Sequence, residues 1–559
     1  MRSMPARSRR TRGRRAWAAA AVTLLTLACG GGDGAGGGGD GGGKAAGGRE
    51  PEAAGEPKRG GTLVMSNPSD RDALNPLVST DFDTMEIMRF LLFMTLVQYD
   101  EDMNLKPYLA ESWEVAEDGL SMTFHIRKDV TWHDGTPTTA EDVKFTYEKA
   151  IEPELAYPNV ATFQYYRNAE IVDPYTVRFN FTRPFAEPVE NLALVPIAPK
   201  HLLEATPGAD MRNAPFNRNP VGNGPFKFVR WKANEELVLE ANDAFSPSLG
   251  GRPHIDRFVT LVVPEQTTEV SMLLTGQSDM MRAVPPQDAE RVESSDVARL
   301  IVYPTRQYVY VAWNPKLPLF DSAAERTAMT LAVNRQQMID ALLYGYGDIA
   351  VSHTFETSWA RDPSLQPLPY DPERAKALLA EQGWKDSDGD GVLDQGGRRF
   401  EFELMTNEGN DLREDMLVMI KSDLAKVGVA VKPVLREWTV MLEEFQRKDY
   451  EAFVAGWVPD FVYDPRDLFH SEAIAGKYNF VSFANARADS LIDLGLATVR
   501  REDAKPVWAD FQRILAEEQP YTWLYLGRER VGLSRRVKGE MKLDARGHLV
   551  HVRDWWLDG

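Results

Sequence analysis

The chain has 559 residues, 43% of them hydrophobic, and it includes 13 tryptophans, so it is long enough to form several well-packed domains. It carries 64 Lys and Arg residues against 83 Asp and Glu residues, which gives a formal net charge of -19. This excess of negative charge argues against a nucleic-acid partner and against direct attraction to anionic lipid.

Residues 1–29 are predicted to be a targeting segment rather than part of the fold. An arginine-rich stretch precedes an apolar run from Ala16 to Ala28, which is too short to span a bilayer as a mature helix. The sole cysteine follows in Leu25-Thr26-Leu27-Ala28-Cys29, which resembles the cleavage box of bacterial lipoproteins. The resemblance implies a lipid on Cys29, with ordinary signal cleavage near Ala28 as the alternative. A single cysteine leaves no disulfide within the chain.

Residues 30–60 are almost entirely Gly, Ala, Glu, Asp and Lys. Such a composition cannot bury apolar surface, so we expect a flexible tether. Gly61 to Met65 is predicted to be the first strand, and Ser79, Thr80 and Asp81 lie in the segment that follows it. These three are candidates for ligand contact, although an ordinary loop also explains them.

The stretch from Leu105 to Ala150 is the most informative part of the chain. Leu120, Met122, Phe124 and Ile126 alternate with polar residues, which is typical of a half-buried strand. Turns are predicted at residues 117–119 and 133–137, where Gly and Pro allow the chain to reverse. Thr138 and Glu141 have the spacing of a capping box, which predicts that a helix begins here.

This stretch resembles the family 5 solute-binding proteins of ABC transporters, the extracytoplasmic receptors of the peptide, dipeptide and nickel type. Its Ala-x-Ser-Trp, Asp-Gly, His-Asp-Gly-Thr-Pro and Ala-Glu-Asp-Val elements fall at Ala110–Trp113, Asp118–Gly119, His133–Pro137 and Ala140–Val143. The resemblance implies an α/β fold of the periplasmic-binding-protein type, a clamshell of two lobes joined by a hinge. It also implies the additional α+β domain of the large, three-domain type II form.

The resemblance further implies how the chain divides. Lobe I would combine residues 61–100, 206–305 and 526–559, the extra domain would be residues 101–205, and lobe II would be residues 306–525. Further along the chain, strands are expected near residues 175–181, 237–242, 257–263 and 308–314. Ser322 and Asp371 are expected to cap helices, the second of which ends at Gly383.

The acidic run from Asp386 to Asp394 is similar to the first nine positions of an EF-hand calcium loop. Asp386, Asp388, Asp390 and Asp394 have the spacing of its first carboxylate ligands. The position of the bidentate Glu is occupied by Gly397, and no helix pair is predicted around the loop. Structural calcium is therefore one interpretation, and a hairpin-like turn without any cofactor is the other.

The stretch from Gly456 to Pro465 resembles the family's Gly-Trp-x-x-Asp-Tyr-x-x-Pro segment, whose Asp pairs with the α-ammonium group of bound peptides. The matching residue is Asp460, with Phe461 in place of Tyr. A desolvated carboxylate favours an ammonium group, and Trp457 would supply an apolar or cation–π wall. Alternatively, Asp460 only caps a turn. Arg413 lies where dipeptide receptors place a carboxylate-binding Arg, although it could equally be a solvated residue at a helix start.

The predicted function is that of a lipid-anchored, extracytoplasmic receptor. It would capture a peptide or peptide-like solute and deliver it to an ABC permease and its ATPase, as a monomer that touches the membrane only through its lipid. Alternatives are binding of an oligosaccharide, an opine or a metal chelate on the same scaffold, or a sensory lipoprotein without a transport role. No enzymatic activity is expected, because the chain has neither a Gly-x-Ser-x-Gly elbow nor a His-Glu-x-x-His motif.

Overall fold

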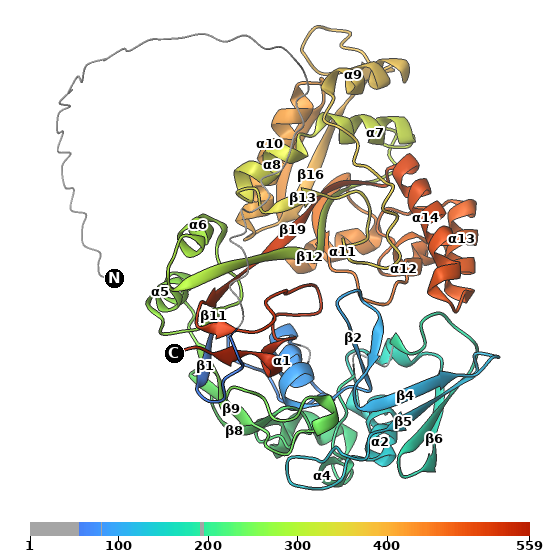
Figure 1. Ribbon diagram of the computed structural model, residues 1–559. Coiled ribbons are helices and arrows are strands. Elements are labelled where there is room, and N and C mark those ends of the chain that lie inside the picture. The colour runs from blue at the N-terminus through green and yellow to red at the C-terminus, as the bar shows by residue number, and fades with distance from the viewer. Residues whose placement is uncertain (1–54, 80, 191–194) are drawn as a thin grey trace, which may run out of the picture. The chain divides into compact units, whose positions relative to one another are not determined.

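The computed structural model describes residues 55–559, apart from Thr80 and residues 191–194. The predicted signal segment with Cys29, most of the tether and the candidate Thr80 therefore lie outside the described residues. The described part of the chain contains an eleven-stranded mixed sheet and a separate four-stranded sheet (Figure 1). No helix within it has both the length and the apolar composition needed to cross a bilayer.

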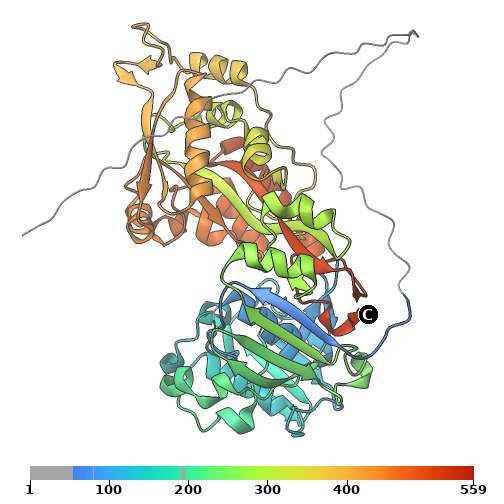
Figure 2. The ribbon, with the colours of Figure 1, turned by 90° about the vertical axis from the view of Figure 1, so that its left-hand side faces the viewer.

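The large sheet runs through both predicted lobes. Its strand order is β17-β16-β18-β12-β19-β11-β1-β10-β9-β8, and β13 also pairs with β19. The lobe I part faces the viewer in Figure 2, with its strands in blue and green. The strands span β17 (Ala430–Arg436), β16 (Glu401–Asn407), β18 (Ala452–Trp457), β12 (Ala298–Trp313), β19 (Tyr521–Ser534), β13 (Gly347–Ile349), β11 (Met280–Met281), β1 (Thr62–Asn67), β10 (Arg257–Val262), β9 (Glu236–Ala241) and β8 (Phe226–Lys232).

Two long antiparallel strands, β12 and β19, connect the halves of this sheet. Their pairing shifts register between Pro304 and Tyr308, so a short irregular segment separates the lobe I part of β12 from its lobe II part. The sequence predicted a strand only for residues 308–314. The first half of β12 was missed because its residues are mostly only partly buried and show no clear apolar alternation.

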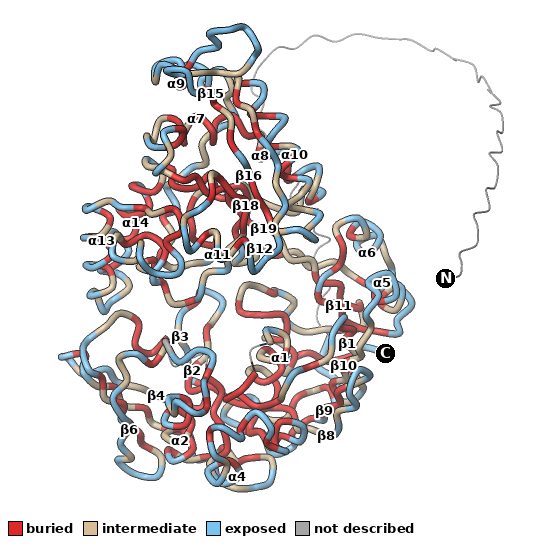
Figure 3. Tube along the Cα trace, turned by 180° about the vertical axis from the view of Figure 1, so that it is seen from behind, coloured by how far each residue is buried: buried red, intermediate tan, exposed pale blue. Residues whose placement is uncertain are grey.

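Lobe II has helices on both faces of the sheet. Val309, Val311 and Trp313 of β12 face one core, and Tyr308, Tyr310 and Ala312 face the other, as the two-residue period of a strand requires. Buried residues follow the central strands (Figure 3). The first core contains α7 (Ala323–Ala332), α8 (Arg335–Leu342), α9 (Pro372–Glu381) and α10 (Asp411–Ala425), and the second contains α11 (Trp438–Arg447), α12 (Arg466–Phe469), α13 (Ala486–Ala497) and α14 (Arg501–Glu518).

Further short helices lie in lobe I and in the extra domain. They are α1 (Phe82–Ile87), which continues into a π-helical turn at Met88–Leu92, and α4 (Lys200–Leu203), α5 (Gln266–Thr275) and α6 (Ala289–Glu293). The expected caps at Ser322 and Asp371 are confirmed, since each side chain accepts a hydrogen bond from the first turn of its helix.

The four-stranded sheet has the order β4-β5-β7-β6, with α2 (Ala140–Ala150) packed against it. The predicted capping box was displaced by one residue: the N-cap is Thr139 and its partner is Asp142. Thr138 cannot be the cap because its backbone N–H donates to Val130 and its buried hydroxyl accepts from Asn223. The strands are β4 (Ala110–Val115), β5 (Ser121–Ile126), β6 (Tyr166–Asp173) and β7 (Thr176–Phe181).

This small sheet shares one continuous hydrophobic core with lobe I. The hairpin of β2 (Val97–Tyr99) and β3 (Leu105–Pro107) crosses the predicted boundary at residue 101. Its tip residues, Tyr99 and Met103, are buried in the second core of lobe II. The lobes are therefore joined twice, by the β12–β19 strands and by side-chain packing of this hairpin. The domain limits given above remain predictions.

Candidate functional site

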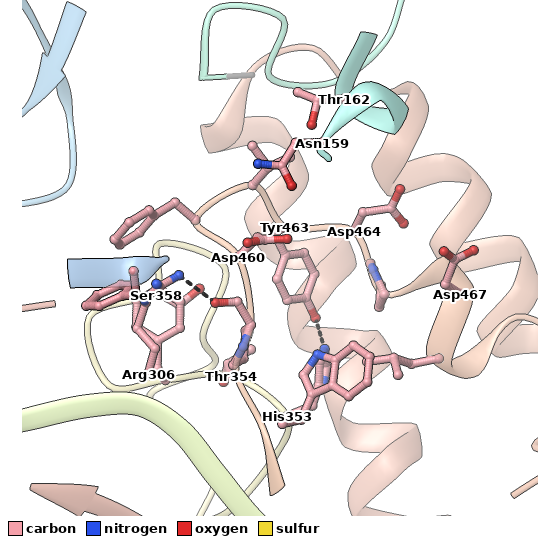
Figure 4. Close-up of a pocket in the computed structure, with 18 of the residues that line it drawn as sticks. Asn159, Thr162, Arg306, His353, Thr354, Ser358, Asp460, Tyr463, Asp464 and Asp467 are labelled. Atoms are coloured by element: carbon pink, nitrogen blue, oxygen red, sulfur yellow. Dashed lines mark hydrogen bonds between the residues drawn. The ribbon is translucent and has the colours of Figure 1, made fainter. Parts of the chain in front are cut away.

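A cavity of about 680 Å³ lies between the two lobes. Lobe I contributes α1 and the turn after it, the extra domain contributes residues near Asn159, and lobe II contributes residues 353–358 and 457–468. Its size is within the range of about 300–1,000 Å³ that is usual for small-molecule sites. Figure 4 shows the side chains that point into it.

The predicted ligand residues Trp457, Asp460 and Phe461 all line this cavity. β18 ends at Trp457, and the chain then forms a loop, residues 458–465, which carries prolines at 459 and 465. Among the described residues, the Asp460 carboxylate forms neither an ion pair nor a hydrogen bond. Asp460 is exposed, whereas the sequence predicted a desolvated carboxylate. Its desolvation would have to come from a bound ligand.

Aromatic rings surround this loop. Phe461 is buried, with its ring centroid 5.3 Å from that of Tyr99 and 6.1 Å from that of Phe355. The ring of Trp457 lies 5.4 Å from that of Tyr478. Rings at these separations hold one another in place, so the loop presents a fixed apolar wall next to Asp460.

Sequence reasoning missed Arg306, which lies in the irregular segment of β12. Its guanidinium lies 4.3 Å from the ring centroid of Phe461 and donates to the carbonyl oxygen of Pro459 over 2.8 Å. Burial lowers the pKa of Arg306, and the negative charge of Asp460 opposes that shift. The only signal in the sequence was a polar triplet, residues 305–307, that interrupts an otherwise apolar strand.

A second cation, Arg89, comes from the π-helical turn of lobe I. Burial, and then the positive charge of Arg306, lower the pKa of Arg89 to about 10. Glu86 lies one turn before Arg89, but the charge of Glu86 is already matched by another cation. Arg282 Nη2 lies 3.1 Å from the Glu86 carboxylate, which also accepts a hydrogen bond from the backbone N–H of His548. Although burial opposes the shift, Arg282 and His548 lower the pKa of Glu86 to about 2.

Arg413 does not line the cavity, contrary to the sequence prediction of a carboxylate-binding residue. Its guanidinium donates to the side-chain oxygen of Asn407 over 2.7 Å and packs against Gly456. A Cβ atom at Gly456 would come within 3.0 Å of it, so the glycine before Trp457 leaves room for this arginine. Burial lowers the pKa of Arg413. Thr80 and Cys29 lie outside the described residues, and the roles predicted for them stay predictions.

The acidic loop forms a turn with internal hydrogen bonds. Asp386 accepts from the backbone of Gly389 and Gly391, Asp394 accepts from Ser387, and Asp390 pairs with Arg399. Carboxylate oxygens of Asp386, Asp388 and Asp390 lie within 4.8 Å of one another, and all three residues are exposed. Asp388 also accepts a hydrogen bond from the backbone N–H of Asp390, so all four predicted ligands are engaged with groups of the protein, which fits a cation loop poorly. Calcium binding remains an untested prediction.

Comparison with known proteins agrees with this arrangement. A sequence model of the bacterial extracellular solute-binding proteins, family 5 (middle), matches residues 104–477. The chain is 34% identical over 513 residues to the oligopeptide-binding protein AppA of Bacillus subtilis (strain 168), which covers 90% of this chain and 93% of the relative.

Two solved structures are similar over almost their whole length. The structure of AppA from Bacillus subtilis in complex with a nonapeptide has a TM-score of 0.71 and 33% identity, and it covers 90% of this chain and 100% of that chain. The structure of NikZ from Campylobacter jejuni in complex with Ni(L-His) has a TM-score of 0.71 and 26% identity. It covers 89% of this chain and 99% of that chain. Members of the matched family are extracytoplasmic transport proteins that bind solutes and are not enzymes. The chain belongs to family 5 of the bacterial extracellular solute-binding proteins and has the multi-domain α/β clamshell fold that its sequence predicts.

Proposed function

We propose that this protein is a lipid-anchored receptor that captures a peptide between its lobes and delivers it to an ABC import permease. The observation that supports this most is the charge distribution of the interlobe cavity. The exposed carboxylate of Asp460 and the half-buried side chains of Arg306 and Arg89 face the same space. A peptide with free ends carries one charge of each sign and would match both.

The peptide's α-ammonium group would bind Asp460. No described side chain forms an ion pair or a hydrogen bond with this carboxylate, and a charge-assisted hydrogen bond is about twice as strong as a neutral one. Asp464 and Asp467 also line the cavity, and in Figure 4 they lie on the side of Asp460 opposite Arg306. Burial raises the pKa of Asp464. This end of the cavity therefore favours cationic groups.

The ligand's carboxylate would lie toward Arg306 and Arg89. The two guanidiniums repel each other. After burial, this repulsion is the next largest reason why the pKa of Arg89 is lowered. An anion near both would reduce this repulsion. Arg306 belongs to the connection between the lobes and Arg89 to lobe I, so such an anion would also favour the closed arrangement.

Between the charged ends, part of the cavity wall is apolar. Phe82, Met85, Phe355, Trp457 and Phe461 contribute to it. The thioether of Met85 adapts to ligand side chains of different shape, and the aromatic rings offer an apolar surface without a specific polar contact. The relation to AppA, whose solved complex holds a nonapeptide, also favours a peptide. We therefore propose recognition of the peptide's charged ends with tolerance toward its side chains.

The remaining parts of the proposal concern the membrane. A lipid on Cys29 and a tether over residues 30–60 would keep a monomeric receptor close to its permease and ATPase. Support comes from the signal-like residues 1–29 and from the family, whose members serve transporters. Radiolabelled palmitate incorporation into the parent but not into a Cys29→Ser variant would test the anchor.

A metal chelate is the second candidate ligand, because the NikZ structure contains Ni(L-His). The carboxylates of a chelate could use Arg306 and Arg89. It would leave Asp460 without a cationic partner unless it also carried an ammonium group, and for this reason we favour a peptide.

The proposal is tested by mass spectrometry of solute that co-purifies with the native protein, followed by calorimetry with that solute. Asp460→Asn should weaken binding by about 30-fold or more, since loss of one partner from a desolvated charge pair costs about 2–5 kcal/mol. Asp415→Asn, at an exposed position on α10, makes the same charge change away from the cavity and should bind like the parent. Equal affinity of the Asp460 variant would refute the proposed peptide contact.

A further inference from the structure

Three charged side chains are buried together where the extra domain meets lobe II. Glu187 and Glu190 come from the extra domain, and Arg501 is the first residue of α14. Arg501 Nη2 lies 2.8 Å from Glu187 and 3.1 Å from Glu190. The exposed fraction of the side chain is 3% for Glu187, 11% for Glu190 and 17% for Arg501. We call Glu187, Glu190 and Arg501 the clasp.

The clasp joins the two halves at a place other than the β12–β19 strands. Arg501 also donates to the carbonyl oxygen of Met103, at the tip of the β2–β3 hairpin, over 2.8 Å. Beside it, the backbone N–H of Ala186 donates to the carbonyl oxygen of Leu496 on α13 over 3.1 Å. In Figure 1, β2 reaches from the lower half toward α12 and α14. Any opening about β12 and β19 that moves lobe II away must break these contacts.

The clasp also contacts the loop that carries Asp460. Glu187 accepts a hydrogen bond from the backbone N–H of Tyr463 over 3.0 Å, and Tyr463 lines the cavity three residues after Asp460. The Tyr463 hydroxyl lies 2.7 Å from the Nε2 atom of His353, which lines the cavity as well. The state of the clasp is thus linked through one hydrogen bond to the position of the 458–465 loop.

The charges of the clasp do not balance. Two carboxylates face one guanidinium. Among the described residues, the phenol of Tyr99 on β2 also faces them, and it is neutral because burial and the two glutamates raise its pKa. A buried group with excess negative charge is costly, so one carboxyl tends to keep a proton. Burial, and then the charge of Glu190, raise the pKa of Glu187 to about 7, and burial also raises the pKa of Glu190. The pair titrates as a unit.

We propose that the clasp is a proton-dependent lock between the lobes, so that closure of the cleft takes up a proton. When the lobes separate, both carboxyl groups reach water and their pKa values return toward the ordinary 4.5. The closed form then binds more protons than the open form, and acidification favours closure. With these values the closed-to-open ratio rises about tenfold between pH 8 and pH 6.

The test needs no ligand, so it stands or falls independently of the proposed peptide function. Cys29 is the only cysteine, so a Cys29→Ser background accepts two new labelling sites. Val172→Cys on β6 and Val418→Cys on α10 place labels on exposed positions of the two halves. Pulsed electron–electron spin resonance then measures the distribution of interlobe distances in the full chain at pH 8 and pH 6.

In the parent, the ratio of short to long interlobe distances should be about tenfold higher at pH 6 than at pH 8. Glu190→Gln should remove most of this response and favour the short distance at both pH values, because one carboxylate then faces one guanidinium. Glu187→Gln should do the same, since glutamine still accepts from Tyr463. Glu111→Gln, an exposed position on β4, should respond like the parent. A parent without a pH response, or an equal response in both clasp variants, would overturn the proposal.

Discussion

His133, which lies in the stretch from Leu105 to Ala150, gives a direct test of how this stretch is held against lobe I. Its Nδ1 atom accepts a hydrogen bond from the backbone N–H of Gly222 over 3.1 Å, and its Nε2 atom lies 3.0 Å from the carbonyl oxygen of Gly224. The ring is therefore neutral with its proton on Nε2. His133→Ala removes two hydrogen bonds of about 1 kcal/mol each and part of the local packing. We expect a loss of about 3–4 kcal/mol at pH 7.5.

The pH dependence of this loss provides the sharper measurement. Burial lowers the pKa of His133 to about 4, from an ordinary value of 6.5. A second ring proton would face the N–H of Gly222, which explains why the folded state disfavours it. The unfolded chain therefore binds the proton first, and the parent loses stability as the pH falls below 6.5. Between pH 7.5 and pH 5 this loss is about 2 kcal/mol.

Urea denaturation of the parent and of His133→Ala at both pH values checks the reasoning. The difference between the two proteins should shrink by about 2 kcal/mol at pH 5, because the variant has no such histidine to protonate. His125→Ala, on the half-buried strand β5, serves as the control and should show no comparable change. A difference of the same size at both pH values would refute the assignment of His133 as a buried neutral bridge.

Four other outcomes are expected. Gly222→Ala should lower the free energy of unfolding by at least about 3 kcal/mol in urea denaturation, because its Cβ would lie 1.8 Å from the carbonyl oxygen of Leu92. Gly389→Ala should lower it by only about 1 kcal/mol, because no atom lies within 4 Å of the new Cβ and only the positive φ opposes the change. In calorimetry, Arg413→Met should leave peptide affinity unchanged. Arg306→Met should weaken a free-acid peptide more than its C-terminal amide. Millimolar calcium should not change the melting temperature, and a rise that Asp388→Asn abolishes would instead establish a calcium loop.

The sequence was most informative where a motif and a simple period coincide. Met122, Phe124 and Ile126 are buried on one face of β5 as their alternation predicts, and the Gly-Trp segment leads into the cavity. These features are local, so a single stretch of sequence contains all the information needed to predict them.

The features that the sequence did not reveal depend on contacts between distant segments. Arg306 and Arg89 are separated by more than two hundred residues, and the polar triplet at residues 305–307 does not by itself show that Arg306 lies in the same cavity as Arg89. The same holds for the clasp, in which Glu187 meets Arg501 across the two halves of the protein. The resemblance suggests Arg413 as a carboxylate ligand because dipeptide receptors place an Arg there, but its side chain turns toward Asn407. Sequence spacing gives no information about that direction.

The central claim is that Asp460 receives the free amino group of a peptide. Calorimetry with one peptide, in free and N-acetylated form, on the parent and on Asp460→Asn tests it most directly. We expect acetylation to weaken binding to the parent by about 30-fold or more and to have little effect on the variant, because the charge pair is already absent. Equal loss on acetylation in both proteins would contradict the account, since the amino group would then bind elsewhere.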